Sequence, residues 1–269
     1  MFGAIAPHGG IAIAEACSAA ERDLASTTRA GMEELGRIFD QAKPDVTLVI
    51  TPHNVHISNA LGVIVAGRIA GRLSGTSIAL DVPSDMELAW NVLGSMGAAG
   101  VPSAGVGFGS NDPSTAVAPM DWGVLIPVWF MGGRHDPPVP VVVVTPARDL
   151  PAEAHVEAGR AIAAAAAATA QRVALIASAD HGHAHVADGP YGYHAAAGEY
   201  DSMIRDMVAG DALGRLCDIP PELVENAKAD SWWQVLVLHG ATGGFRGRLI
   251  SYEAPTYFGM LTAVYLPVS

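Results

Sequence analysis

Three histidines at alternating positions follow an aspartate at the end of an apolar run, in the segment RVALIASADHGHAH (residues 172–185). Imidazole groups exchange protons near neutral pH and are common ligands of transition metals. An apolar run that ends in such a group is typical of a buried strand that delivers a reactive side chain to the edge of a sheet. The question is whether other apolar runs of this chain end in residues of the same chemical kind.

Four candidate strands do end in this way. FGAIAPH ends at His8 and VTLVITPH ends at His53, while VALIASADHGH ends at His181 and His183 and GRLISYE ends at Glu253. Ligands of open α/β sheets bind outside the carboxyl ends of the strands, so these residues can meet if their strands are neighbours. Two imidazoles and one carboxylate form the ligand set of non-haem Fe(II) enzymes that leaves coordination positions open. A single histidine after a strand is more often a loop or capping residue, and only the coincidence of the four ends favours a metal site.

The elements that would position these residues alternate between short β-branched runs and longer helical patterns, which is typical of a mainly parallel sheet flanked by helices. The expected strands are Phe2–Ala6, Val46–Thr51, Gly62–Ala66, Ser77–Asp81, Val139–Thr145, Val173–Ser178, Arg248–Tyr252 and Leu261–Tyr265. The expected helices are Ser26–Gln41, Ser84–Met96, Ala152–Ala170, Ala195–Ala209 and Ser231–Gly240. We predict one α/β domain over residues 1–269, with a mainly parallel or mixed central sheet and helices on both faces.

Two segments without a clear periodic pattern carry further expectations. The segment Gly97–Pro119 is dense in glycine, serine and proline, and we expect a long loop there, of the kind that often forms a functional lid. The apolar run YFGMLTAVYLPV near the end of the chain is expected to be an inner strand rather than a dimer surface.

Composition excludes several classes of partner. The chain has 27 acidic and 15 basic residues and a formal charge of −12, which repels nucleic acids and anionic membranes. No uninterrupted apolar run approaches the roughly 18 residues that span a bilayer, and the first ten residues lack the basic region of a secretory signal. Cys17 and Cys217 form neither a disulfide framework nor a CxxC motif. We therefore expect a soluble, cytoplasmic protein.

The collected motifs resemble those of the class III extradiol ring-cleavage dioxygenases, the superfamily typified by the catalytic subunit of protocatechuate 4,5-dioxygenase, and are most similar to its less characterised bacterial branch. The stretches that carry the resemblance, in the family's order, are APHGG, TPHNVH, MDWGVLIPVWFM, ASADHGHAHVADGPYGYH and SYEAPTYFG. The resemblance implies a non-haem Fe(II) held by His8, His53 and Glu253, with Zn as an alternative metal. It also implies that His183 is the acid/base residue and that Asp180 orients its loop.

One motif departs from the family pattern. The usual Asp-His-Gly is Asp121-Trp122-Gly123 here, so a histidine that helps to bind or protonate the substrate oxygens is missing. Trp122 could stack on an aromatic ring or fill the pocket. His181 could take over the missing catalytic role, and we expect Asp121, Trp122 and His194 to contact the substrate.

The implied activity is extradiol cleavage of a catechol-type or aminophenol-type ring by dioxygen, as in aromatic compound catabolism. The expected partners are a small aromatic substrate and dioxygen, and we expect a homo-oligomer, with a second subunit as an open alternative. Two other functions remain open. One is a Zn or Fe hydrolase on the same fold, in which the metal acidifies a bound water. The other is a catalytically impaired partner or binding subunit, which the presence of Trp122 favours.

Overall fold

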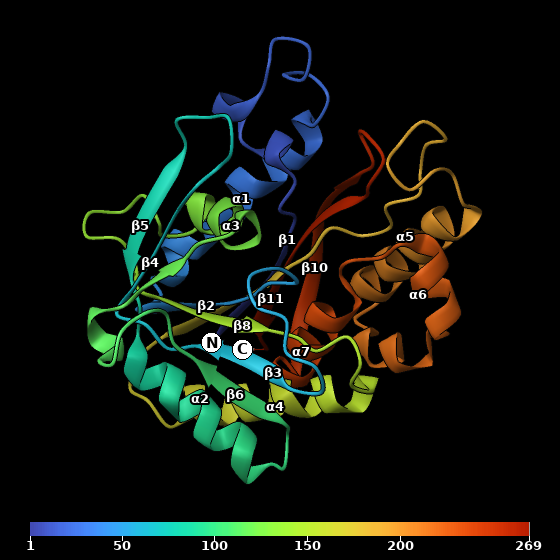
Figure 1. Cartoon of the computed structure of the whole chain (residues 1–269). Coiled ribbons are helices and arrows are strands. Elements are labelled where there is room, and N and C mark those ends of the chain that lie inside the picture. The colour runs from blue at the N-terminus through green and yellow to red at the C-terminus, as the bar shows by residue number, and fades with distance from the viewer. Residues whose placement is uncertain (269) are drawn as a thin grey trace.

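The structure is a computed structural model that describes residues 1–268, and it is built around one mixed sheet of eight strands (Figure 1). Their order across the sheet is β10-β11-β1-β9-β2-β8-β3-β6. The strands are β1 (Phe2–Ala6), β2 (Val46–Ile50), β3 (Leu61–Ile64), β6 (Ser103–Val106), β8 (Val141–Thr145), β9 (Val173–Ser178), β10 (Phe245–Glu253) and β11 (Met260–Pro267). The four central strands β1, β9, β2 and β8 are parallel, whereas β3 and β11 are antiparallel to their neighbours β8 and β1. The predicted fold class is therefore confirmed.

The central strands are buried along their whole length because both faces of the sheet are covered. In β2, Val46, Leu48 and Ile50 belong to one hydrophobic core, and Val49 belongs to the other. The same alternation divides β9 between the two cores. Burial on two faces favours runs of valine, isoleucine and leucine over an alternation of apolar and polar residues.

Seven helices among the described residues divide between the two cores (Figure 1). The first core contains residues of α2 (Met86–Ala98), α4 (Ala152–Ala167), α5 (Ala195–Ala209), α6 (Pro221–Ala227) and α7 (Trp232–Ala241). The second contains residues of α1 (Ser26–Ala42) and α3 (Trp122–Phe130). Helices α4 and α7 pack closely, since a Cβ atom added to Gly159 would lie 2.0 Å from the backbone oxygen of Val237. Glycine at this position thus helps to fix α7 against α4.

Several elements were not predicted. A second sheet, of three strands in the order β5-β4-β7, consists of β4 (Arg68–Arg72), β5 (Ala79–Pro83) and β7 (Val117–Pro119). The expected strand Ser77–Asp81 overlaps β5, whereas β4, β7 and the pairing of the three strands were not predicted. The prediction of one long loop over Gly97–Pro119 was wrong, because that segment contains the end of α2, β6, a short 3-10 turn at Pro113–Thr115, and β7. These strands have three or four residues each and include glycine, serine or proline, so they carry little periodic signal. Helix α3 has an internal Pro127 and six buried residues in succession, which conceals its helical period.

The apolar C-terminal run is an inner strand, as predicted, because β11 pairs with β10 on one side and with β1 on the other. No helix formed by residues 1–268 has the length and apolar character needed to cross a membrane.

Candidate metal centre

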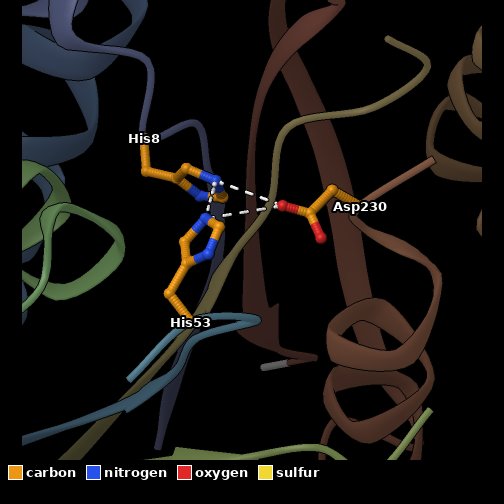
Figure 2. A group of neighbouring side chains, drawn as sticks. All are labelled: His8, His53 and Asp230. Carbon is orange, nitrogen blue, oxygen red and sulfur yellow. Dashed lines mark hydrogen bonds and ion pairs between the residues drawn. The ribbon is translucent and has the colours of Figure 1, made fainter. Parts of the chain in front are cut away.

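His8 and His53 meet where two parallel strands end. His8 follows β1 and His53 follows β2, and β9 lies between these strands in the sheet. The two Nε2 atoms are 3.2 Å apart, and the ring planes are inclined by 83° (Figure 2). The shared direction of β1 and β2 places both imidazoles at the same edge of the sheet, as expected from the strand ends.

The carboxylate beside the two imidazoles belongs to Asp230. Its Oδ2 atom is 3.6 Å from Nε2 of His8 and 3.6 Å from Nε2 of His53 (Figure 2). Within residues 1–268, these three side chains form the one group of histidine, cysteine or acidic residues with the spacing of a metal site, and their ligand atoms lie within 4.8 Å of one another. Asp230 precedes α7 and follows no strand, so the search for strand ends missed it.

Glu253 does not join this cluster in the structure. It ends β10, which runs in the same direction as β1 but is separated from it by β11. Its carboxylate oxygens are not among the ligand atoms that gather within 4.8 Å of one another around His8 and His53. The Glu253 carboxylate instead accepts a hydrogen bond from the backbone N–H of Thr28, in the first turn of α1, where helical N–H groups lack partners within the helix. The structure therefore replaces Glu253 with Asp230 as the third member of the site.

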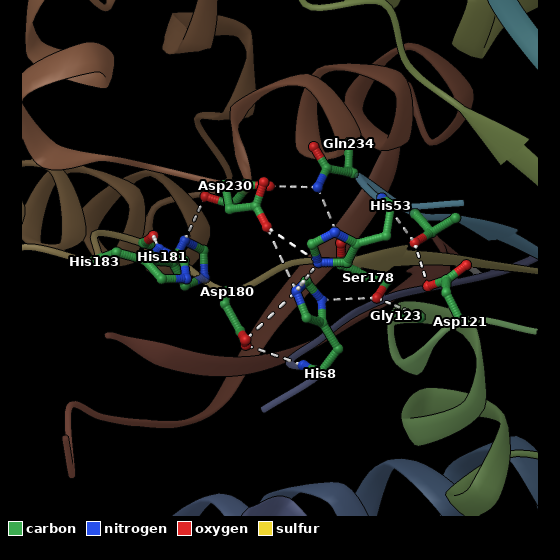
Figure 3. Close-up of polar contacts among 12 residues, drawn as sticks. His8, His53, Asp121, Gly123, Ser178, Asp180, His181, His183, Asp230 and Gln234 are labelled. Atoms are coloured by element: carbon green, nitrogen blue, oxygen red, sulfur yellow. Dashed lines mark hydrogen bonds and ion pairs between the residues drawn. The ribbon is translucent and has the colours of Figure 1, made fainter. Parts of the chain in front are cut away.

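The hydrogen bonds of His8 determine which of its nitrogens carries the proton. Its Nδ1 lies 3.0 Å from Oγ of Ser178, and that hydroxyl donates its own hydrogen to the backbone oxygen of Gly123 (Figure 3). The Ser178 oxygen can then only accept from His8, so Nδ1 is protonated. In the neutral ring, Nε2 has a free lone pair directed at the cluster, which is the tautomer required of a metal ligand.

Replacement of Ser178 by alanine is expected to weaken metal binding by about 10- to 100-fold, because His8 would lose the acceptor that fixes its tautomer and ring orientation. Isothermal titration of the metal-free protein with Zn²⁺ would measure the change. Thr47→Ala is a matched control, since it removes a buried hydroxyl from β2 that has no hydrogen-bond partner. Equal affinities for both variants would contradict the assigned role.

The pKa values of the two imidazoles are shifted in opposite directions, although nearby carboxylates raise both. Burial alone would lower the pKa of His8, but the charges of Asp180 and Asp230 outweigh it, and the pKa is raised. The pKa of His53 is lowered, first by burial and then by the neighbouring His8. Burial would raise the pKa of Asp230, but His8, Arg148 and His53 together lower it. The Asp230 carboxylate is thus favoured in its ionised form, which is the form that binds a cation.

The donor set fits a transition metal. Ligand atoms about 2.1 Å from one ion, at tetrahedral angles, would lie about 3.4 Å from one another. The three observed separations, 3.2, 3.6 and 3.6 Å, are close to this value. Two imidazole nitrogens and one carboxylate oxygen suit Fe(II) and Zn²⁺ better than Ca²⁺ or Mg²⁺, which prefer oxygen ligands. His8, His53 and Asp230 are therefore the residues that could hold the metal.

The cluster borders a cavity of about 890 Å³. Aromatic side chains form much of its wall, among them Trp122, Tyr191, Tyr257 and Phe258. His183 also borders this cavity, and its ring stacks on Phe258 with centroids 5.4 Å apart. The cavity thus combines a cation site with flat apolar surfaces and one further imidazole.

The sequence matches, over residues 3–264, the protein family described as the catalytic LigB subunit of aromatic ring-opening dioxygenase. The chain belongs to this family. This match confirms the resemblance to class III extradiol dioxygenases. Protein CA_C1420 of Clostridium acetobutylicum is 23% identical over 256 residues, which cover 92% of this chain and 53% of that protein. The chain thus spans about half the length of this curated relative.

The fold is also similar to that of an uncharacterised protein, JW3007, from Escherichia coli K12, known from its crystal structure. The TM-score is 0.63, and the alignment covers 98% of this chain and 99% of that one. The sequence identity is 18%, so the comparison shows a shared fold.

The departure from the family motif at Asp121-Trp122-Gly123 has a clear local structure. Trp122 is 50% exposed, borders the cavity and packs against His53 with ring centroids 4.2 Å apart. It therefore forms part of the cavity wall without filling the interior. Asp121 caps the N-terminus of α3 and accepts hydrogen bonds from Thr51 and Asn54. Its position supports the loop that carries His53, and it is not among the described residues that line the cavity.

Two histidines that were predicted to belong to the site, His181 and His194, lie outside the cavity lining in this LigB-family chain. His181 is completely buried, and its Nδ1 lies 2.9 Å from Oγ of Ser231. Burial lowers the pKa of this imidazole. His181 is also not among the described residues that line the cavity. His194 is exposed and caps α5, with Nδ1 accepting a hydrogen bond from the N–H of Ala196. The structure thus supports neither the catalytic role predicted for His181 nor the substrate contact predicted for His194.

The loop that carries His183 is held by a buried carboxylate that the sequence did not reveal. Asp201, in α5, accepts hydrogen bonds from the N–H of Gly182 at 2.7 Å and from the hydroxyl of Tyr252 at 2.8 Å. Its second oxygen also lies 2.9 Å from Nε2 of His185. Asp180, which the resemblance assigned to this loop, instead accepts a hydrogen bond from the backbone N–H of His8 (Figure 3).

Proposed function

We propose that this LigB-family chain is a metal-dependent dioxygenase that opens a catechol-type or aminophenol-type aromatic ring, with Fe(II) as the metal and Zn²⁺ as the alternative. The observation that carries the proposal is the convergence of His8, His53 and Asp230 at the border of a cavity that His183 and aromatic side chains also line. The small aromatic substrate and dioxygen are the proposed partners.

The cation, when bound, would supply a Lewis acid and adjacent positions where the substrate oxygens and dioxygen can react within one complex. The role of this chain is to hold it with two neutral imidazoles and one carboxylate. His8 is kept in the required tautomer by Ser178, and His53 is positioned by its backbone N–H, which donates to the hydroxyl of Thr51. All three members of the cluster border the cavity, which leaves room for substrate beside them.

His183 has the tautomer of a general base. Its Nδ1 lies 2.8 Å from the backbone oxygen of His181, and a carbonyl oxygen can only accept, so Nδ1 carries the hydrogen. The neutral ring therefore has its lone pair on Nε2. We propose that Nε2 accepts a proton from a substrate hydroxyl and later returns it, a task for which an imidazole is suited near neutral pH.

The aromatic wall suits a flat substrate. Trp122, Tyr191, Tyr257 and Phe258 provide faces and edges for contacts with an aromatic ring. Trp122 also packs against the ring of His53, so it helps to orient a proposed metal ligand in addition to lining the cavity.

A second candidate function is metal-dependent hydrolysis, and the observation that favours it is Trp122. The family histidine at this position would exchange protons with substrate oxygens, whereas an indole cannot. His183 alone is sufficient to remove a proton from a metal-activated water. The cluster of His8, His53 and Asp230 argues against an inactive partner subunit, because such a subunit has no need of a complete ligand set.

Oxygen uptake separates the two functions. Protein reconstituted with Fe(II) under anaerobic conditions is expected to consume dioxygen when a substituted catechol or aminophenol from a panel is added, and to form a ring-opened product with a new absorption band. His53→Ala serves as the matched control and is expected to show neither signal. A wild-type protein that binds Fe(II) but consumes no dioxygen with the whole panel, and that cleaves ester or amide substrates, would reject the dioxygenase in favour of the hydrolase.

A further inference from the structure

The two carboxylate oxygens of Asp230 face different partners. Oδ2 is the atom 3.6 Å from the imidazole nitrogens of His8 and His53. Oδ1 points away from them and accepts a hydrogen bond from the guanidinium group of Arg148. Figure 2 shows one oxygen directed to the two imidazoles and the other pointing away from them. The second oxygen is the one bound by Arg148.

Arg148 connects two elements around the site. It follows β8, the strand beside β2, and its guanidinium lies over the ring of Trp233 in α7, with a distance of 4.9 Å to the ring centroid. A planar guanidinium stacked on an indole has a defined orientation, so its donor is held in place for Oδ1.

The backbone of Asp230 is fixed independently of Arg148. Its N–H donates to the backbone oxygen of His181 at 3.3 Å, and its carbonyl oxygen accepts from the side chain of Gln234 (Figure 3). The freedom that remains is rotation of the carboxylate about its side-chain bonds. Among residues 1–268, the Asp230 carboxylate forms ion pairs with Arg148 and with the two histidines of the site, and with no other basic side chain.

We infer that Arg148 is a positioning residue that holds the Asp230 carboxylate with a single oxygen directed toward the metal. The inference rests on the proposed metal centre. A carboxylate that binds through one oxygen occupies one coordination position and leaves the others to substrate. Outer partners of this kind typically contribute about 10- to 100-fold to metal affinity, because they orient the ligand before the metal arrives.

A purely electrostatic role for Arg148 would change the metal affinity in the opposite direction. A positive guanidinium close to a cation repels it, so loss of the charge alone would strengthen metal binding. Loss of the hydrogen bond to Oδ1 would weaken binding, because the carboxylate would rotate freely in the metal-free protein. The direction of the change therefore distinguishes positioning from charge.

The test uses the metal-free full chain, titrated with Co²⁺ and Zn²⁺ in competition with a chelator of known affinity. Arg148→Met keeps the apolar stem on Trp233 and removes both the donor and the charge, and we expect about 10- to 100-fold weaker binding and an altered visible spectrum of bound Co²⁺. Arg148→Lys retains a donor and is expected to restore part of the affinity. Arg134→Met is the matched control, since Arg134 also stacks on a tryptophan, Trp129, at 4.8 Å, but pairs with no member of the site.

Unchanged or tighter Co²⁺ and Zn²⁺ binding by Arg148→Met overturns the inference, as does an Arg148→Lys variant as weak as Arg148→Met. The Arg148 side chain is 47% exposed, so the methionine variant is expected to fold, which a thermal melt without metal would verify. If it does not fold, Arg148→Gln carries the test with the same expected direction. Failure of the proposed metal centre has a different signature: the wild-type chain and a His53→Ala variant would then bind Zn²⁺ equally, and the role of Arg148 would be rejected with it.

Discussion

Replacement of Asp230 by alanine is expected to abolish stable metal binding, whereas replacement of Glu253 by alanine is expected to leave it intact. Asp230 supplies the carboxylate oxygen 3.6 Å from both imidazole nitrogens, and its loss leaves only two ligands. The fall in affinity should exceed the roughly 10- to 100-fold typical of an outer partner. Metal content after reconstitution and dialysis, together with titration by Zn²⁺, would measure both variants.

Glu253→Ala has its own expected effect, which makes it an informative control. Its carboxylate accepts from the N–H of Thr28 in the first turn of α1, and loss of such an acceptor typically costs about 0.5–2 kcal/mol of stability. The variant should therefore melt at a lower temperature while it keeps full metal content. Metal loss in Glu253→Ala together with retention in Asp230→Ala would reverse the assignment and restore the ligand set expected from the strand ends.

The contrast between Asp230 and Glu253 shows what the sequence could predict about the site. The apolar runs before His8 and His53 identified strands, and the rule that parallel strands present their carboxyl ends at one edge predicted that these residues meet. Glu253 also lies at that edge, but its carboxylate accepts a hydrogen bond from the N–H of Thr28, a contact between distant segments that the local pattern does not contain. Asp230 lies in a turn before a helix, where an aspartate is ordinarily interpreted as a cap.

The loop after β9 illustrates a second limit. The alternation of His181 and His183 would place both rings on one face of a continued strand. The strand ends at Ser178, however, and Gly182 passes so close to α5 that an added Cβ would lie 2.9 Å from the Cα of Ala197. The chain therefore turns, His181 becomes buried against Ser231, and His183 borders the cavity. Neither α5 nor its carboxylate Asp201 could be placed beside this loop from the sequence.

The alternation of strands and helices could be predicted from the sequence more closely than the site, because it depends on periodicity and burial within short segments. The bounds of β1, β9 and α5 agree with the predicted ranges at both ends. The three-stranded sheet escaped prediction because β4 contains Gly71 and two exposed arginines, a pattern that is not distinct from a loop. The second sheet thus forms from pairing between distant segments rather than from strong local preference.

His183→Gln is expected to lower turnover by about 10²- to 10⁴-fold while metal content stays at the wild-type level. The reason is specific to one atom: Nδ1 is committed to the backbone oxygen of His181, so Nε2 is the free base that borders the cavity, and glutamine has no group that exchanges protons near neutral pH. Turnover would be measured by dioxygen uptake with the catechol or aminophenol that the panel identifies, and metal content by elemental analysis of the same samples.

His194→Gln is the matched control for this variant. His194 lies nine residues beyond His185 in the same segment and is exposed at the cap of α5, so its replacement should cost stability at the helix terminus and leave turnover unchanged. Solvent isotope effects add a readout that a structural defect would not reproduce, since loss of the proton acceptor should make proton transfer rate-limiting in His183→Gln alone. Wild-type turnover in His183→Gln, or an equal loss in His194→Gln, would show that the proton passes through another group. Asp180 and Tyr257 are two other ionisable groups that border the cavity, and their variants would be measured next in the same assay.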